Sequence, residues 1–164
     1  MPFELPDNLH PDCAPIAWLL GTWQGNGHGD YPTIESFQFG QECIFTHDGR
    51  PFFHYMSRAW IVDAQGEKVR DGAIETGFLR PKADGSLEWL LTHNTGFAEV
   101  YYGTAGGAKI EVSTDAVVRT HSAKKYVGGH RLYGLVEGDL LWAYDMAAVG
   151  EELQPHLWGR LVRQ

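Results

Sequence analysis

Glycine and tryptophan occupy alternate positions in one extended run near the start of the chain. Residues 21–29 read GTWQGNGHG, and the positions of one parity are Gly21, Trp23, Gly25, Gly27 and Gly29. Residues two apart in a β-strand share a face, so this face carries one large ring and four missing side chains. Each glycine inside a strand costs roughly 0.5–1 kcal/mol relative to alanine. The pattern therefore predicts a strand that bends sharply, or one whose backbone lies close to a bulky ligand.

Turn sequences recur beyond this run at intervals of roughly ten residues, as expected for hairpin tips. These are Asp48-Gly49, Gln65-Gly66, Asp84-Gly85, Gly106-Gly107, Gly128-Gly129 and Glu137-Gly138-Asp139. The runs between them, such as residues 52–62 and 140–146, are rich in aromatic and β-branched residues that favour strands. A long antiparallel meander removes its exposed edges by closing. We therefore expect an all-β fold, an antiparallel up-and-down β-barrel of about ten strands with room for one small ligand.

A short apolar run precedes the predicted strands. Residues 11–20 read PDCAPIAWLL, in which Pro15 limits a helix to one or two turns and Gly21 is placed to end it. We therefore expect a short N-terminal helix there. No linker, repeat or low-complexity segment interrupts the 164 residues, so residues 1–164 are expected to form a single domain.

Charge and composition exclude several classes of partner. The formal net charge is -8 and the 13 Lys and Arg residues are spread along the chain, so no nucleic-acid partner is expected. No apolar run approaches the roughly 20 residues that cross a bilayer, so no membrane partner is expected. Cys13 and Cys43 lack metal-ligand spacing and no apolar leader precedes the fold, so we expect a cytoplasmic protein with free thiols.

Three common catalytic signatures are missing from the sequence. The glycine run continues into Tyr31-Pro32 in a strand pattern instead of opening a helix, so it does not predict a phosphate-binding loop. The sequence has no Gly-x-Ser-x-Gly elbow and no cysteine beside a histidine base, so nucleophilic hydrolysis has no support. The histidines include no pair with the i, i+4 or His-x-His spacing of a zinc site.

The last predicted strand contains the histidine of most interest. Residues 154–163 read QPHLWGRLVR, and Pro155 removes a backbone donor next to His156, as is common at a strand start or edge. Alternation gives one face made of Leu157, Gly159 and Leu161, and another made of His156, Trp158 and Arg160. The period does not say which face is inside, so the pattern leaves His156 as a surface residue, a core residue or a ligand.

Two separated motifs of the chain resemble those of the nitrobindins. The pattern Gly-x-Trp-x-Gly-x-Gly followed by Tyr-Pro-Thr is matched by Gly21, Trp23, Gly25, Gly27 and residues 31–33. The late pattern of the family is matched by Met146, Leu153, His156 and Leu157. The likeness extends from about residue 15 to the end of the chain, with the two motifs in the family's order.

The resemblance implies a cofactor and three site residues. Nitrobindins are β-barrels that hold one b-type haem per chain in an exposed crevice, with a late histidine as axial ligand to iron, and His156 takes that position here. The family also contacts haem through the threonine of Tyr-Pro-Thr and a lysine of an Ala-Lys segment, which correspond to Thr33 and Lys124. Lys124 is then expected to pair with a haem carboxylate.

The activity implied by the resemblance is chemistry on reactive nitrogen species. A ferric haem with an accessible sixth position binds nitric oxide and isomerises peroxynitrite to nitrate, so small molecules are the expected ligands. A distal wall short of hydrogen-bond donors is expected, which disfavours oxygen storage. The sequence leaves a homodimer open.

Other histidines bear on this expectation. His93 stands where many relatives have a residue that does not coordinate iron, so it is either a sixth ligand or a histidine on the rim of the barrel. A sixth ligand would slow the binding of gases, whereas a rim histidine would leave the position open. His28 and His54 are expected to be ordinary barrel residues.

A different class of function fits part of the same sequence. Gly-x-Trp near the first strand is also typical of lipocalins and fatty-acid-binding proteins, whose lumen suits a small apolar ligand. That alternative is a carrier without catalysis. A third alternative is a structural barrel that has lost haem. An absorption spectrum with added haem distinguishes them, because a Soret band that His156→Ala abolishes requires the first interpretation.

Overall fold

The chain folds into one short helix and ten strands. The computed structural model describes residues 3–164. In chain order the elements are η1 (Pro11–Leu19), β1 (Gly21–Tyr31), β2 (Ile34–Thr46), β3 (Phe53–Val62), β4 (Lys68–Pro81), β5 (Ser86–His93), β6 (Phe97–Gly106), β7 (Lys109–Arg119), β8 (Tyr126–Val136), β9 (Asp139–Ala148) and β10 (Gln154–Arg163). The helix η1 is a 3₁₀ helix, and all the strand pairs are antiparallel.

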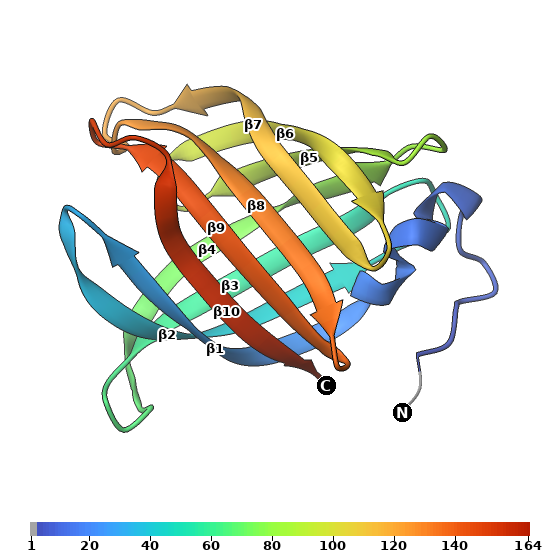
Figure 1. The fold of residues 1–164 in the computed structure, drawn as a ribbon, viewed down its shortest axis with the longest axis horizontal. Coiled ribbons are helices and arrows are strands. Elements are labelled where there is room, and N and C mark those ends of the chain that lie inside the picture. The colour runs from blue at the N-terminus through green and yellow to red at the C-terminus, as the bar shows by residue number, and fades with distance from the viewer. Residues whose placement is uncertain (1–2) are drawn as a thin grey trace.

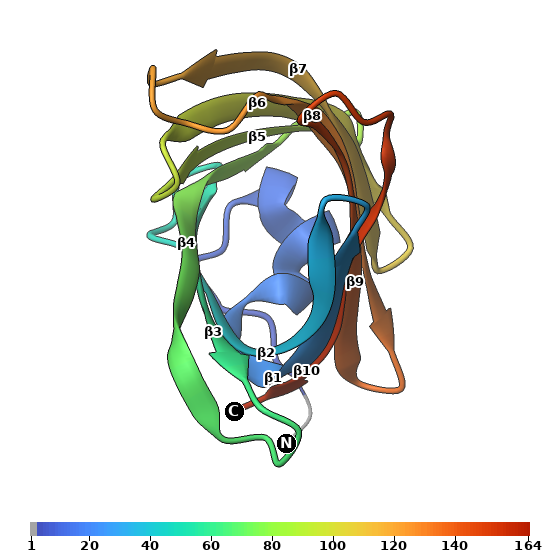
Figure 2. The same cartoon turned by 90° about the vertical axis from the view of Figure 1, so that its left-hand side faces the viewer.

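The strands close into a barrel because the first strand also pairs with the last. The order around the barrel is β1-β10-β9-β8-β7-β6-β5-β4-β3-β2, so each strand lies beside its neighbours in sequence. Figure 1 shows the strands from the side of the barrel, and Figure 2 shows them as a ring. The predicted fold, an up-and-down antiparallel barrel of about ten strands with a short N-terminal helix, is confirmed.

The helix η1 lies at one end of the barrel (Figure 1). It begins at Pro11, whose missing N–H is not needed in a first turn. After the helix, Gly21 leads into β1 with a φ of 121°, a conformation that favours glycine. Ile16 and Leu19 are buried in the core cluster, and the indole N–H of Trp23 donates to the Leu19 carbonyl at 2.8 Å. The helix is therefore tied to the interior of the barrel.

Most of the predicted hairpin tips lie between strands. The correct tips are those at Gly49, Gly66, Gly85, Gly107 and Gly138. The tip predicted at Gly128-Gly129 is wrong, because both residues lie inside β8 next to a register shift. A Cβ at Gly129 would overlap the ring of Tyr144, so this glycine permits close packing between β8 and β9.

The alternate glycines of β1 share the inward-facing side of the strand with Trp23. A Cβ at Gly27 would overlap the ring of Phe39, and a Cβ at Gly29 would overlap the ring of Phe37. The close approach predicted from the glycines therefore comes from aromatic rings of the neighbouring strand β2. These two rings lie 6.1 Å apart between centroids and occupy the space that larger β1 side chains would take.

Large side chains fill the half of the barrel next to η1. The following residues are at most 1% exposed: Trp23, Phe45, Phe53, Tyr55, Leu79, Trp89, Tyr101 and Tyr133. The ring of Trp89 lies 5.0 Å from that of Tyr55 and 5.4 Å from that of Tyr133, measured between centroids. This packing leaves room for a ligand only toward the opposite end of these strands.

Two expectations from composition can be compared with the structure. Cys13 and Cys43 are both free, as predicted, and both are buried. Burial is the main cause that raises the pKa of Cys13 to about 11 and the pKa of Cys43 to about 12, so both thiols are protonated at neutral pH. Within residues 3–164, no helix has the length and apolar character needed to cross a membrane.

Candidate functional site

A cavity of about 400 Å³ lies in the half of the barrel away from η1. Its apolar lining includes Phe37, Phe39, Ala59, Ile61, Phe97, Trp142 and Leu157. Its polar lining includes Gln41, Ser57, Glu75, His93, Lys124, Arg131 and His156. The cavity thus brings together two of the three haem-contacting residues implied by the resemblance, His156 and Lys124.

A β-bulge in β10 turns His156 into the barrel. The pairing of β10 with β9 shifts register between Pro155 and Leu157, which leaves His156 as the extra residue. His156 is 9% exposed and lines the cavity together with Leu157. The prediction that these two residues lie on opposite faces is therefore wrong, because strict alternation does not hold across a bulge.

Backbone and aromatic contacts fix the orientation of the His156 ring. Its Nδ1 lies 3.0 Å from the Asp30 carbonyl oxygen, which only accepts, so Nδ1 carries the proton and Nε2 keeps its lone pair. The ring centroid lies 5.2 Å from that of Tyr31 and 5.9 Å from that of Tyr144, both in edge-on geometry. This arrangement suits a neutral imidazole ligand to a metal.

The electrostatics around His156 also favour the neutral ring. Burial lowers the pKa of His156 most strongly, and the charge of Lys124 lowers it further. The hydrogen bond to the Asp30 carbonyl acts in the opposite direction but does not reverse the shift. Only an unprotonated nitrogen can bind iron, so this shift preserves a ligand at neutral pH.

Tyr31 anchors the part of the site that carries Asp30. Its hydroxyl donates to the Met146 carbonyl at 3.0 Å and accepts from the Ala148 amide at 3.2 Å. The end of β1 is thereby fixed to the end of β9, across the strand that carries His156. The sequence resemblance included Tyr31 within Tyr-Pro-Thr but gave no reason for its presence.

Lys124 and Thr33 occupy different positions relative to the cavity. Lys124 lines the cavity, and its Nζ lies 3.4 Å from the Met146 Sδ. Although the residue as a whole is exposed, partial removal from water lowers the pKa of Lys124, while the charge of Glu99 opposes that shift. Thr33 is exposed in the β1–β2 turn and does not line the cavity.

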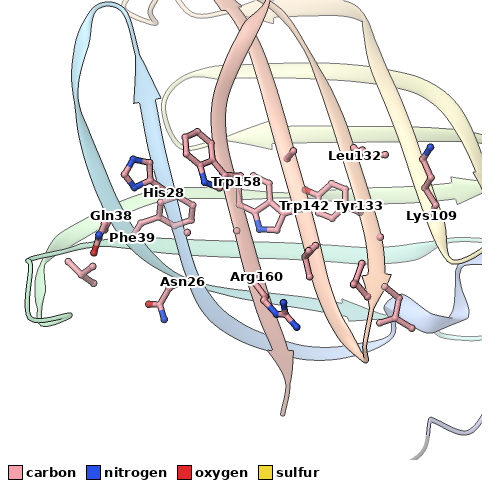
Figure 3. Close-up of a pocket in the computed structure, with 18 of the residues that line it drawn as sticks. Asn26, His28, Gln38, Phe39, Lys109, Leu132, Tyr133, Trp142, Trp158 and Arg160 are labelled. Atoms are coloured by element: carbon pink, nitrogen blue, oxygen red, sulfur yellow. The ribbon is translucent and has the colours of Figure 1, made fainter.

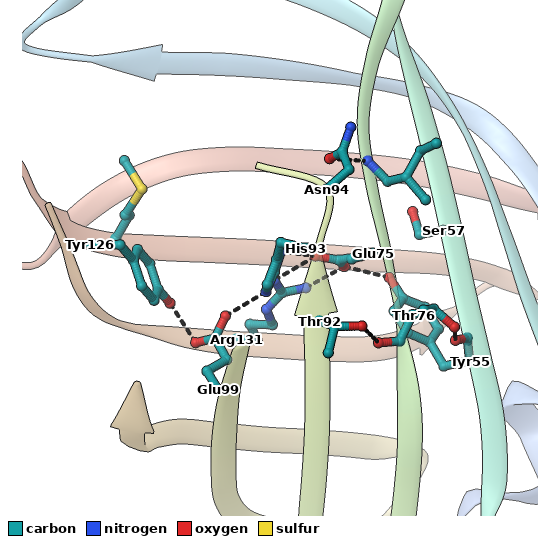
Figure 4. A network of polar contacts seen from close by, with 12 residues as sticks. Tyr55, Ser57, Glu75, Thr76, Thr92, His93, Asn94, Glu99, Tyr126 and Arg131 are labelled. Carbon is teal, nitrogen blue, oxygen red and sulfur yellow. Dashed lines mark hydrogen bonds and ion pairs between the residues drawn. The ribbon is translucent and has the colours of Figure 1, made fainter. Parts of the chain in front are cut away.

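A buried ionic cluster forms one wall of the cavity (Figure 4). Arg131 of β8 donates to both carboxylate oxygens of Glu75 on β4, at 2.6 and 2.8 Å. Burial alone would raise the pKa of Glu75, but the charge and hydrogen bonds of Arg131 lower it to about 2. Arg131 also lies 4.7 Å from the ring centroid of Tyr144, which in turn borders His156. The Arg131 N–H groups are engaged by Glu75, Tyr101 and Tyr133, so this wall is a closed polar cluster.

His93 belongs to the same cluster. Its Nε2 lies 2.7 Å from Glu99 Oε2 and its Nδ1 lies 3.3 Å from Glu75 Oε2. The side chain is 8% exposed, so His93 is buried in the cavity wall at the end of β5. The carboxyl groups of Glu75 and Glu99 were not identified from the sequence. The alternation of strand residues could have identified Glu99 as facing inward, because it lies two residues from both Phe97 and Tyr101, which are core positions of the same strand.

Two polar atoms of the cavity wall lack hydrogen-bond partners among residues 3–164. They are the Gln41 Oε1 and the Trp142 Nε1, and both atoms are buried. Buried polar groups normally have hydrogen-bond partners, so these two atoms indicate a wall that hydrogen-bonds to water or to a bound molecule. Together with the donor set of His156 and Lys124, the wall fits a flat ligand that has an apolar body and a charged edge.

The remaining histidines lie outside this cavity. A larger groove of about 1080 Å³ follows β1, β10 and β9 (Figure 3). In this groove the ring centroid of His28 lies 4.9 Å from that of the half-exposed Trp158. His54 is exposed and hydrogen-bonded to Thr76 at 2.9 Å. In the part of the chain that the structure describes, no group of three His, Cys, Asp or Glu side chains is arranged to hold a metal ion.

Comparison with known proteins agrees with the motifs. The family model described as "THAP4-like, heme-binding beta-barrel domain" matches residues 12–163. A protein named peroxynitrite isomerase from Nocardioides sp. (strain JS614) is 75% identical over 164 residues, which cover 100% of both chains. A ferric nitrobindin-like protein from Cutibacterium acnes is 46% identical over 165 residues and 99% of each chain.

A solved structure gives the same result. The crystal structure of Rv2717c from M. tuberculosis has a TM-score of 0.85 with this chain at 34% identity, and the match covers 95% of this chain and 99% of that one. The resemblance to nitrobindins is confirmed by these relatives. The chain therefore belongs to the family of THAP4-like, heme-binding beta-barrel domains.

Proposed function

We propose that this protein holds one haem b through His156 and isomerises peroxynitrite to nitrate at ferric iron. The observation that carries the proposal is the orientation of His156, whose Nδ1 is held by the Asp30 carbonyl while the ring borders the cavity. Family membership supports haem as cofactor and small molecules as ligands. The names of the relatives, peroxynitrite isomerase and ferric nitrobindin-like protein, support the reaction and the oxidation state.

The protein's contribution begins with a prepared ligand. The Asp30 carbonyl holds the proton on Nδ1 and thereby directs the lone pair of Nε2 to the metal. The ring edges next to Tyr31 and Tyr144 restrict rotation of the imidazole. Because little has to reorganise on binding, the entropy cost of coordination is small.

Other residues orient the macrocycle and exclude water. When bound, haem supplies a ferric iron with an open coordination position at which peroxynitrite rearranges to nitrate. Phe39 and Ile61 give the cavity an apolar wall that would exclude water from around the bound group. Lys124 is the proposed partner of a haem carboxylate, because the hydrogen-bond acceptor of its ammonium group among residues 3–164 is a thioether. Thr33 is proposed as a contact at the outer edge, from the turn that follows Tyr31.

The competing function is a carrier of a small apolar ligand. The lumen that a fatty acid would need is filled next to η1 by side chains such as Trp23, Trp89 and Tyr133. The space that remains is bordered by the Glu75–Arg131 ion pair. Both features favour a flat cofactor with a polar edge over an alkyl chain.

Haem titration of the purified protein tests the ligand assignment. We expect an intense Soret band with wild-type protein, and we expect His156→Ala to lose more affinity than the roughly 100-fold that removal of an outer-shell partner costs. His28→Ala is the matched control, because His28 lies outside the cavity and its removal is expected to leave the spectrum unchanged. Equal haem binding by wild type and His156→Ala would refute the assignment.

Stopped-flow decay of peroxynitrite tests the reaction separately. We expect ferric protein to accelerate the decay and to raise the yield of nitrate, with both effects lost in His156→Ala. Decay no faster than in buffer would refute the activity even for a protein that binds haem. Absence of haem uptake, together with displacement of a fluorescent fatty acid, would instead support the carrier.

A further inference from the structure

His93 and His156 lie on opposite walls of the barrel. In the order of strands around the barrel, β5 is five places from β10 in either direction. His93 is the last residue of β5, and it lines the same cavity as His156. A free imidazole in that position would be a ready sixth ligand for an iron held by His156.

Both ring nitrogens of His93 are already engaged. Nε2 lies 2.7 Å from Glu99 Oε2, and Nδ1 lies 3.3 Å from Glu75 Oε2. An ionised carboxylate only accepts hydrogen bonds, so Nε2 donates to Glu99 and keeps no lone pair for a metal, while Nδ1 faces the Glu75 carboxylate. The ring is also stacked on Phe97, with centroids 4.1 Å apart and planes 22° apart. His93 is therefore restrained at both nitrogens and on one face.

The two carboxylates are themselves held by other strands. Glu99 accepts a hydrogen bond from the Tyr126 hydroxyl at 2.6 Å. Glu75 accepts two from Arg131, at 2.6 and 2.8 Å, and one from the Tyr55 hydroxyl at 2.7 Å. Since β3, β4, β6 and β8 all contribute, the position of these oxygens is set by the barrel as a whole.

The groups that face His93 come from three other strands. Glu75 from β4 and Glu99 from β6 present carboxylates to it, and Arg131 from β8 presents a guanidinium to Glu75. These side chains form one buried cluster whose members hold one another in place. Lys124 lines the same cavity but is exposed and bonded to Met146, so water screens its charge.

We propose that Glu75 and Glu99 are positioning residues, which tether His93 away from the metal and keep the coordination position opposite His156 open for the small-molecule substrate. This inference rests on the proposed haem site at His156. It explains how a cavity can contain a second histidine and still leave ferric iron accessible. A second imidazole ligand could be prevented by having no other histidine in the cavity. In this protein the histidine is present, and the two carboxylates hold it away from the metal instead.

The ferric, haem-loaded protein tests the tether by electron paramagnetic resonance and absorption spectroscopy. We expect a high-spin signal for wild type. Glu99→Leu removes the partner of Nε2, so we expect a low-spin signal typical of two imidazole ligands and a Soret band at longer wavelength. Glu99→Gln is the conservative control, because its amide oxygen still accepts from Nε2, and it is expected to keep the high-spin signal.

The double variant Glu99→Leu/His93→Phe identifies the new ligand. It is expected to return to the high-spin signal, since the released imidazole is absent. A low-spin signal that persists in the double variant, an unchanged high-spin signal in Glu99→Leu, or a two-imidazole signal in wild type would each overturn the tether. Failure of wild type to bind haem would refute the proposed function, which is a distinguishable result.

A second variant keeps the test decisive if Glu99→Leu does not fold. Glu99→Asp preserves the charge but withdraws the carboxylate by one methylene, and it is expected to give a low-spin fraction that His93→Phe removes. Absence of any low-spin fraction in Glu99→Asp would then overturn the tether. Thermal melting of the apo-proteins establishes which variants are folded before haem is added.

Discussion

The two halves of the barrel interior differ in what their inward-facing side chains do. Next to η1, residues such as Trp23, Leu79 and Trp89 are fully buried and pack against one another. In the other half, a cavity is bordered by the Glu75–Arg131 ion pair and by His156. The same ten strands form both halves, so the difference comes from the side chains and not from the topology.

The strand β1 shows how this difference is built. Near η1 its inward position is Trp23, whereas farther along it is Gly27 and Gly29. The glycines admit Phe39 and Phe37 from β2, and those rings form part of the cavity wall. We infer that the half next to η1 supplies most of the free energy of unfolding. The cavity half has less apolar packing because it leaves space for a binding site.

The largest effect on stability is expected in the half next to η1. Trp89→Ala removes a fully buried indole packed between Tyr55 and Tyr133, so it should lower the free energy of unfolding by about 3–5 kcal/mol. Trp158→Ala is the matched control, because Trp158 is 42% exposed on the outer face. Urea unfolding of both apo-variants measures the contrast. Equal losses for the two would contradict the division between the halves.

The ion pair on the cavity wall gives the next prediction. Arg131→Met leaves the buried carboxylate of Glu75 without its arginine partner, which should cost about 3 kcal/mol. Adding Glu75→Gln to Arg131→Met should recover part of this loss. Arg160→Met, which breaks the exposed pair with Asp139, should cost much less, because water screens that pair. A denaturant series on the four proteins checks the order.

Acid should weaken the cavity half through the same pair. The pKa of Glu75 is lowered from 4.5 to about 2 in the folded protein, so the unfolded chain binds its proton first as the pH falls. The stabilisation is complete well above pH 4.5 and is lost as the pH falls toward 2, by an amount on the order of 3 kcal/mol. The pH dependence of unfolding should be shallower in Arg131→Met/Glu75→Gln. The same slope in both proteins would exclude Glu75 as its source.

Sequence reasoning predicted the packed part of the molecule better than the site. Alternating strands, turn glycines such as Gly66 and Gly85, and a helix limited by Pro15 depend on local chemistry that a single sequence displays. The orientation of His156 depends on a bulge, which inserts one residue into a pattern of period two without a distinct composition. The motif therefore identified His156 as the candidate ligand, but its geometry had to come from the structure.

The ionic cluster was missed for a different reason. Glu75, His93 and Arg131 lie on β4, β5 and β8, and their contacts depend on barrel closure and stagger. Each one alone resembles an ordinary strand residue that faces water. Alternation along one strand can suggest that a single residue faces inward. Only the register of the closed barrel shows that side chains so far apart in the sequence meet.

A smaller effect is expected where β1 approaches the cavity wall. Gly27→Ala places a methyl group against both the Phe39 ring and the Trp158 carbonyl oxygen, so the ring and the backbone of β10 both have to move and the cost should be about 2 kcal/mol. Gly106→Ala is the control, because a Cβ there meets no atom within 4 Å. Thermal unfolding of the two variants measures the difference. No loss in Gly27→Ala would show that Phe39 yields freely and that the glycine is not required for packing.

The smallest effect on the apo-protein is expected at the candidate ligand itself. Within the described residues the His156 side chain makes one hydrogen bond, to the Asp30 carbonyl, so His156→Ala should lower the free energy of unfolding of apo-protein by only about 1 kcal/mol. Haem at 100 times its dissociation constant should stabilise wild type by about 2.7 kcal/mol, because it binds the folded state. The same haem concentration should leave His156→Ala almost unchanged. Unfolding curves with and without haem thus separate the two roles, since a residue needed mainly for packing would show its full loss before haem is added.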